Sequence, residues 1–254
     1  MNCTCKLSNR RILELPSGLR PRFLSRLGRS ELETVLAEAT HRRFPTLSVV
    51  VHEEDPAERV SILTSGRGRH FVLTANGRKI ILHWLTPGQV FGGAAVVSTP
   101  SRYLASTEVV SDSCALVWDR KTIRELMMRY PVLLDNALSI AVTEHIAWLI
   151  GARISLSSDD APSRIADLLI SLACGIGNEG PDGVEIPVGN EDIALGASVS
   201  PFTVSRTLSK WQQDGILRRG RGKVVLLQPE YLAGQWTGPQ LPGREFMEIV
   251  SAAR

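Results

Sequence analysis

The side chains with the clearest chemical pattern lie between residues 200 and 225, where six Lys and Arg residues accompany a single acid, Asp214. Residues 1–26 repeat this imbalance, with six Lys and Arg residues against Glu14. Each block therefore carries +5, and a net charge of +3 for the whole chain leaves −7 elsewhere. Such a distribution would attract a polyanion to two places and repel it from the rest. Two solvated basic faces that bind nothing are the alternative.

The pattern of residues 190–213 predicts two short helices. Asn190 is a suitable N-cap for the first helix, and Gly196 lies where that helix would stop. Ser200 caps the second helix, with Pro201 at the first helical position. The buried stripe of the second helix is predicted to consist of Val204, Leu208 and Trp211. Two short helices joined by a turn of three or four residues form a helix-turn-helix.

The exposed side of the second helix carries groups that suit base edges in a DNA major groove. Arg bonds guanine, Ser and Thr bond bases or phosphates, and an aromatic ring can contact the thymine methyl. Residues 216–227 then read as a basic β-hairpin, a wing suited to phosphate contacts. The predicted DNA-binding residues are Ser200, Phe202, Thr203, Ser205, Arg206, Lys210, Arg219, Arg221 and Lys223. A small helical subdomain with a charged hairpin and no DNA role is the alternative.

These basic elements follow a β-rich region. Residues 44–118 contain six short β-prone runs between turn signals, which predicts an antiparallel sandwich or barrel. Asn76-Gly77 predicts a hairpin with a type I′ turn. Ahead of this region, the spacing of Ser30 and Glu33 predicts a capping box and a short helix over residues 30–40.

After Asp119, which can cap a helix, the apolar period becomes helical. Pro131 opens a second helix that we expect to run to about residue 155. It has an apolar seam long enough for a partner helix: Leu134, Leu138, Ala141, His145, Leu149, Ala152 and Leu156. We expect it to pack on its own β domain and on a second copy of itself, giving a homodimer. A core helix of a monomer is the alternative.

The expected domain organisation follows from these patterns, and its overall class is α+β. The segments are a basic arm at 1–29, a β-barrel sensor domain at 30–120, a dimerisation helix region at 121–156, a hinge at 157–163, a winged helix-turn-helix at 164–228, and a C-terminal extension at 229–254. A Gly-rich loop at 175–183 precedes a strand at 184–188.

This order of elements resembles the CRP/FNR superfamily of bacterial transcription regulators over about residues 31–228. The likeness is strongest in TVSRTL, in DGILRRGRGKVVLL and in GRKIILHWLTPGQVFGGAAV. The resemblance implies a cyclic-nucleotide-binding-like barrel, a dimer, double-stranded DNA as ligand and RNA polymerase as a partner. It places Ser205 and Arg206 at the family's base-contacting pair, and Phe202 where many members carry a Glu.

The sensor departs from the family pattern for cyclic AMP. Gly93, Leu104 and Ala105 stand where the resemblance places a ribose-binding Glu and a phosphate-binding Arg-Ser pair. An unpaired phosphate charge would be costly to desolvate, so we expect an effector other than cyclic AMP, if there is one. A shift in register would bring Arg102 into reach of a phosphate. The expected effector pocket comprises Gly92, Gly93, Leu104, Ala105, His145, Trp148 and Leu149.

Other classes of function find little support in the sequence. No catalytic, metal-binding or phosphate-loop motif is recognisable, so we expect neither an enzyme nor a bound cofactor. The four cysteines, at positions 3, 5, 114 and 174, have no regular spacing and are expected to be free thiols in a cytoplasmic protein. No apolar run is long enough for a membrane span. A haem-based gas sensor acting through His145, and a non-DNA scaffold, remain alternatives.

Overall fold

The computed structural model describes residues 15–146, 149–150, 153 and 160–234. The chain divides into two compact units, the first comprising Met1–Thr74 and Leu82–Thr143 and the second Ala75–Ile81 and Glu144–Arg254.

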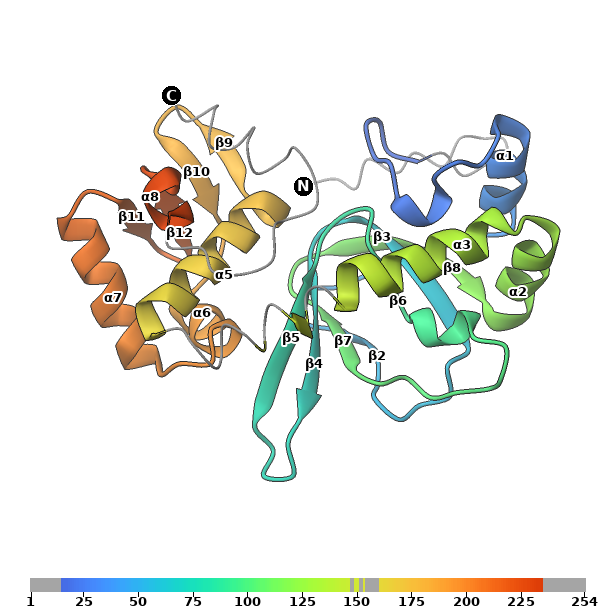
Figure 1. The fold of residues 1–254 in the computed structure, drawn as a ribbon, viewed down its shortest axis with the longest axis horizontal. Coiled ribbons are helices and arrows are strands. Elements are labelled where there is room, and N and C mark those ends of the chain that lie inside the picture. The colour runs from blue at the N-terminus through green and yellow to red at the C-terminus, as the bar shows by residue number, and fades with distance from the viewer. Residues whose placement is uncertain (1–14, 147–148, 151–152, 154–159, 235–254) are drawn as a thin grey trace. The chain divides into compact units, whose positions relative to one another are not determined.

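The first unit contains two four-stranded antiparallel sheets, with strand orders β1-β8-β3-β6 and β2-β7-β4-β5 (Figure 1). This arrangement confirms the predicted antiparallel β domain. Two of its strands, β1 and β6, were not among the predicted runs. The strands are β1 (Thr40–Phe44), β2 (Val49–Val51), β3 (Arg59–Ser65), β4 (Gly68–Leu73), β5 (Lys79–Leu85), β6 (Val90–Phe91), β7 (Ser106–Val109) and β8 (Ser113–Asp119).

The turn between β4 and β5 differs from the prediction. A type I′ turn requires positive φ at both central residues. Gly77 has a φ of +77°, but Asn76 does not have positive φ. The connection is a five-residue loop over 74–78, and a loop of this length can reverse the chain with a single left-handed residue.

The core of the first unit is built on the sheet that contains β3 and β8. Trp118 on β8 and Ile62 on β3 are fully buried, together with Ile123 of α2 (Arg120–Arg129). The indole N–H of Trp118 donates a hydrogen bond to the carbonyl of Val35, 2.8 Å away. Burial of this ring therefore leaves no unpaired donor.

The helix before β1 starts earlier than predicted. This helix, α1 (Arg29–Ala37), has Gly28 as its N-cap, and Ser30 lies within the first turn. The Gly28 N–H donates to the carboxylate of Glu31 at 2.8 Å. Glu33, the acid expected in the capping box, forms an ion pair with Arg29 instead. The prediction identified the helix but placed its N-cap at Ser30 instead of Gly28 and its capping acid at Glu33 instead of Glu31.

The segment expected to be a basic arm is folded over its described part. Phe23 and Leu24, in the short helix η1 (Arg22–Leu24), are buried in the core. The side-chain amide of Asn136, itself buried, donates to the carbonyls of Phe23 and Ser25 at 3.0 and 2.7 Å. These bonds fix the segment against α3 (Val132–Ser139).

The helix expected over residues 131–155 is not one continuous α-helix. Asp119 caps α2 as predicted, since its carboxylate accepts from the N–H of Thr122 at 2.9 Å. After α3 the chain continues as a π-helical segment, η3 (Ile140–Ile146). The Thr143 hydroxyl donates to the Ser139 carbonyl at 2.8 Å, so a side chain bonds a carbonyl that a regular helix reserves for a backbone N–H. Ala152 and residues 154–159 lie outside the described residues.

The second unit combines helices with a four-stranded sheet in the order β11-β12-β10-β9 (Figure 1). Its first helix begins at Ala161, so the last three residues of the expected hinge are helical. Asp160 caps it by accepting from the N–H of Ser163 at 2.9 Å. The expected Gly-rich loop contains the unpredicted strand β9. The elements are α5 (Ala161–Ile176), β9 (Asn178–Gly180), β10 (Gly183–Ile186), α6 (Asn190–Gly196), α7 (Pro201–Gln213), β11 (Leu217–Gly220), β12 (Lys223–Leu226) and α8 (Pro229–Ala233).

Two further expectations concern single features. Cys114 is disulfide-bonded, which corrects the expectation of a free thiol there, whereas Cys174 is free as expected. Cys3 and Cys5 lie outside the described residues. Within the described part of the chain, no helix combines the length and apolarity needed to cross a membrane.

Candidate nucleic-acid interface

Helices α6 and α7 are separated by residues 197–200, which form the predicted tight turn. Ser198 has a φ of +53°, and the Val199 N–H donates to the Ala194 carbonyl at 3.0 Å. A Cβ at Gly196 would lie 2.7 Å from a methyl carbon of Leu168. Glycine at this position therefore lets the turn pack closely against α5.

The caps of the two helices differ in how well the sequence predicted them. The N-cap of α6 is Gly189, not Asn190, and it makes no side-chain hydrogen bond. Glycine is among the residues that N-cap positions accept, and Gly189 has the extended backbone typical of such a position. The N-cap of α7 is Ser200 as predicted, and its hydroxyl accepts from the Thr203 N–H at 3.0 Å. The predicted buried stripe of α7 is confirmed: Val204, Leu208 and Trp211 are all buried.

The opposite face of α7 presents three side chains at four-residue steps. Phe202, Arg206 and Lys210 are all exposed, and residues four apart on a helix share a face. Neither the Arg206 nor the Lys210 side chain makes a hydrogen bond or ion pair within the described residues. Ser205 is half-buried beside them. The hydroxyls of Ser200 and Thr203 lie 2.8 Å apart and hydrogen-bond to each other, so the cap already engages both.

The predicted wing is the hairpin of β11 and β12, with Arg221 and Gly222 at its turn. Gly222 has a φ of +69°, which glycine adopts without strain. Arg219 is directed back to α7, where its guanidinium donates to the Ser209 hydroxyl at 2.9 Å and its N–H to the Gln212 side chain at 3.1 Å. The guanidinium thereby joins the wing to α7.

Two other wing cations are paired with acids. Lys223 lies 2.6 Å from the carboxylate of Glu185 on β10, and Arg218 lies 2.9 Å from that of Asp182. Arg221 is exposed and forms no ion pair within the described part of the chain. Asp182 and Glu185 were not predicted as counter-ions. They come near these cations through the sheet order β11-β12-β10, which local sequence patterns do not specify.

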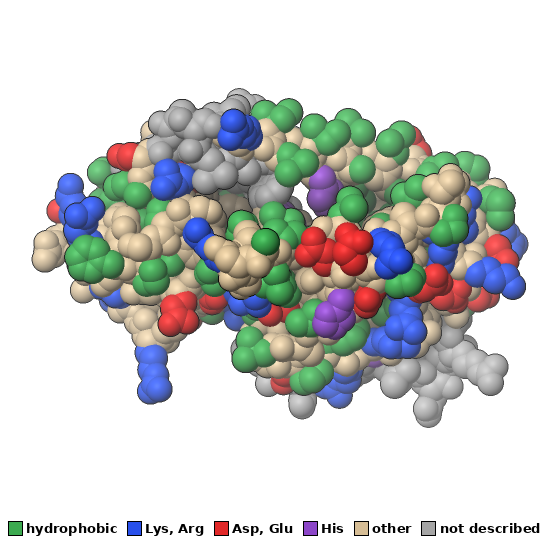
Figure 2. Space-filling model, turned by 90° about the horizontal axis from the view of Figure 1, so that it is seen from below, with side chains coloured by type: hydrophobic (Ala, Val, Ile, Leu, Met, Phe, Trp, Pro, Cys, Tyr) green, Lys and Arg blue, Asp and Glu red, His purple; other side chains and the backbone are tan. Residues whose placement is uncertain are grey.

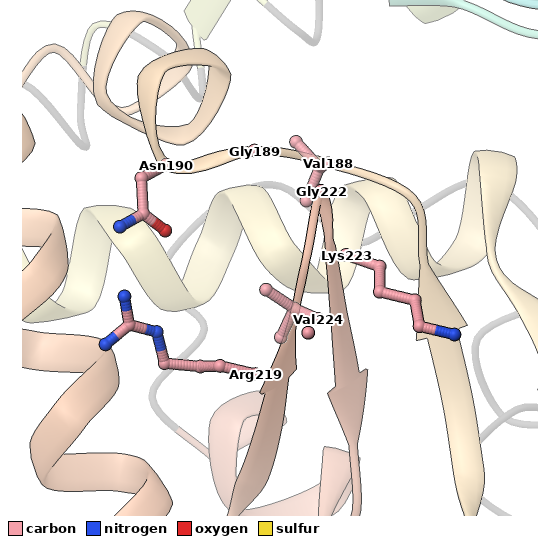
Figure 3. Close-up of a pocket in the computed structure, with 8 residues that line it drawn as sticks. Val188, Gly189, Asn190, Arg219, Gly222, Lys223 and Val224 are labelled. Carbon is pink, nitrogen blue, oxygen red and sulfur yellow. The ribbon is translucent and has the colours of Figure 1, made fainter.

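A shallow cleft of about 220 Å³ lies between the wing and the start of α6. Its lining consists of Val188, Gly189, Asn190, Arg219, Gly220, Gly222, Lys223 and Val224. Figure 3 shows the side chains of Asn190 and Arg219 extending toward one another, whereas Lys223 extends away from them. An amide and a guanidinium that converge in this way can donate to a phosphate oxygen. Asn190 was expected to cap α6, whereas the structure places it in the lining of this cleft.

The charges on the face of the molecule seen in Figure 2 are mixed. Figure 2 shows acidic and basic side chains interspersed over one face of the molecule.

The positions expected to form an effector pocket differ in their exposure to solvent. Gly92 precedes the short helix η2 (Gly93–Val96) with a φ of +74°, and Leu104 is 85% exposed. Gly93 and the side chains of His145 and Leu149 are exposed, Ala105 is half-buried, and Trp148 lies outside the described residues. The guanidinium of Arg102 donates to the carbonyl of Glu54.

Two arginines that the sequence did not single out hold η2 and the residue that follows it. The guanidinium of Arg120 donates to the carbonyls of Ala95 and Val97, each at 2.8 Å, and that of Arg124 donates to Val96 at 2.9 Å. Both arginines come from α2. They fix the backbone of the region where the family resemblance expects an effector.

Two family models match the chain in the order seen in the structure. Residues 41–130 match the cyclic nucleotide-binding domain, and residues 163–234 match the Crp-like helix-turn-helix domain. The chain belongs to the CRP/FNR family of transcription regulators. This CRP/FNR chain places the winged helix-turn-helix of the family after its β domain, and α8 falls within the matched helix-turn-helix region.

Individual relatives of this CRP/FNR protein agree with that assignment. It is 26% identical to the cyclic AMP receptor protein of Thermus thermophilus, over 81% of this chain and 92% of the relative. It is 27% identical to the nitrogen fixation regulation protein FixK of Azorhizobium caulinodans, over 77% of this chain and 78% of the relative. The solved structure of FixK2 from Bradyrhizobium japonicum has the same fold, with a TM-score of 0.69 at 22% identity, covering 79% of this chain and 98% of that one.

Proposed function

We propose that this family member is a homodimeric regulator that reads a near-palindromic DNA site with α7. The observation that carries the proposal is the exposed row of Phe202, Arg206 and Lys210 on a helix whose other face is buried. Residues near the start of a recognition helix contact base edges in the major groove. Phe202 and Arg206 occupy the first two turns of α7, and Lys210 lies one turn further on, where it can contact the DNA backbone.

Phosphate contacts fall to the wing and the cleft beside it. Arg221 is available at the turn, and Arg219 faces Asn190 across the cleft. Phosphate contacts fix the register of a protein on DNA without carrying sequence information. The predicted residue set thus divides into base readers on α7 and positioning residues on the wing, with Ser200 and Thr203 acting mainly through the cap.

The proposed dimer forms through the apolar residues after Pro131. Leu134, Leu138 and Leu149 of the predicted seam are 53%, 61% and 57% exposed in the single chain, and Val142 and Ile146 are exposed as well. Exposed apolar rows of this kind on a helical segment indicate a surface that a second helix covers. A two-fold axis would then place two copies of α7 about 34 Å apart, in successive major grooves.

We infer that the effector, if one acts, is not cyclic AMP. Leu104 and Ala105 offer no charged partner for a cyclic phosphate. The guanidinium of Arg102, two residues before Leu104, is held at the connection between β2 and β3 by its hydrogen bond to the carbonyl of Glu54. A phosphate charge without a cation is costly to desolvate. Isothermal titration with cyclic AMP should give no heat of binding. A haem-sensing role gains no support from His145, whose side chain is exposed.

The test of the proposed function is selection from a random duplex library with the purified full chain at two salt concentrations. The proposal expects enrichment of a two-fold symmetric site at both salts, with weaker recovery at the higher salt because phosphate contacts release counter-ions. Recovery of sequences without shared bases or symmetry would contradict it.

A further inference from the structure

Phe202 is an exposed apolar side chain that does not belong to the buried face of its helix. It is 76% exposed at the second position of α7, outside the helix's buried stripe. Between residues 160 and 234, the exposed large hydrophobic side chains of the structure are Phe202 and Tyr231. Tyrosine carries a polar hydroxyl for water, whereas phenylalanine presents only apolar surface, which favours a partner that removes it from water.

The surroundings of Phe202 limit what that partner can be. The nearby hydroxyls of Ser200 and Thr203 are engaged with each other at 2.8 Å, so the first turn of α7 offers little hydrogen bonding to a base. Arg206, four residues on, is exposed on the same face. The reading surface at the start of α7 therefore consists of an aromatic ring beside a planar cation.

We propose that Phe202 determines specificity by packing on the C5-methyl group of a thymine, next to a guanine bound by Arg206. This inference rests on the proposed function and names the bases that α7 reads. The thymine methyl is the apolar group that a base pair presents in the major groove, and guanine offers the two acceptors that suit a guanidinium. Side chains four residues apart lie about 6 Å apart along a helix, and base pairs are stacked about 3.4 Å apart. The thymine and guanine are therefore separated by about two base pairs or fewer.

Deoxyuridine provides the test, because it removes the methyl group and leaves the hydrogen-bonding edge unchanged. Each thymine of the selected site is replaced in turn, in both half-sites, and dissociation constants are measured with the full chain. We expect one thymine per half-site whose replacement weakens binding about fourfold, or about 15-fold when both half-sites are changed. These values follow from about 0.8 kcal/mol per buried methyl group.

Variants assign the effect to Phe202. Phe202→Ala should bind thymine and uracil at that position equally while still discriminating against replacement of the guanine. Phe202→Leu, which keeps an apolar contact, should retain part of the preference. Tyr231→Ala, on α8, serves as a matched control for loss of an exposed aromatic ring and should leave the thymine preference unchanged. Because Phe202 is largely exposed, circular dichroism should show native folding of its variants.

The outcomes distinguish failure of the Phe202 assignment from failure of the proposed DNA-binding function. If no thymine of the selected site responds to uracil, or if Phe202→Ala retains the full response, the assignment to Phe202 is overturned while DNA binding by α7 stands. If the wild-type protein selects no sequence at all, the proposed function fails, and this inference fails with it.

Discussion

The ion pair between Lys223 and Glu185 leads to a prediction about the strength of DNA binding. The lysine Nζ lies 2.6 Å from the carboxylate, and the two side chains are 46% and 38% exposed. If Lys223 neutralises a phosphate in the complex, it must first leave Glu185. Exposed ion pairs of this kind contribute at most about 1 kcal/mol. Glu185→Gln should therefore tighten binding by up to about fivefold per protomer, or about 25-fold for a dimer.

The assay is fluorescence anisotropy with the selected duplex over a range of salt concentrations. The gain should shrink as salt rises, because screening weakens the ion pair that the substitution removes. Glu179→Gln is the matched control. It changes the charge equally on the same sheet, at a residue that forms no ion pair within the described structure. In Lys223→Gln, the further change Glu185→Gln should have little effect, which isolates the pairwise interaction.

Competition between Glu185 and a phosphate for Lys223 is refuted if Glu185→Gln and Glu179→Gln tighten binding equally, since net charge alone would then explain the gain. It is refuted equally if Glu185→Gln weakens binding, because Glu185 would then orient Lys223 for the phosphate instead of competing with it.

Three further predictions concern assembly and stability. Leu138→Glu, on the exposed apolar row, should convert the dimer to a monomer in sedimentation velocity, whereas an unchanged dimer would place the interface elsewhere. Ser200→Ala removes the cap of α7 and should lower the free energy of unfolding by about 1 kcal/mol in urea denaturation; no loss would show that the cap contributes little. Hydrogen bonds from the Thr122 N–H and hydroxyl lower the pKa of Asp119 from 3.8. The folded state thus gains stability above pH ~4 that is lost as pH falls through the lower folded pKa. The stability difference between the wild type and Asp119→Asn should shrink as the pH falls below about 4, and a constant difference would contradict the assignment.

The sequence predicted the elements whose signals are local. Ser200 and Pro201 mark the start of α7, and the apolar spacing of Val204, Leu208 and Trp211 identifies its buried face. Both features depend on residues within one or two helical turns, so they can be read without knowledge of the rest of the fold. The hairpin after α7 was predictable for the same reason, because its glycines and alternating apolar residues are contiguous.

Features that depend on distant residues were predicted poorly. The fixing of residues 22–25 by Asn136 joins positions more than 100 residues apart, and nothing local distinguishes them from a free basic arm. Glu185 becomes the partner of Lys223 through the register of β10 with β12. The π-helical segment Ile140–Ile146 interrupts an otherwise regular helical pattern, and no residue within it breaks the apolar spacing from which the helix was predicted.

The central claim, that α7 reads base sequence in a dimer, is tested most directly by the affinity of Arg206→Ala for the selected duplex and for a scrambled duplex. One bidentate arginine–guanine contact contributes about 1–3 kcal/mol, and a dimer makes two. We predict a loss of at least about 30-fold for the selected duplex, with much less change for the scrambled one. Lys210→Ala should weaken both duplexes to a similar extent. Equal loss on both duplexes for Arg206→Ala would contradict the account, because Arg206 would then contact the phosphate backbone and α7 would not read the sequence through it.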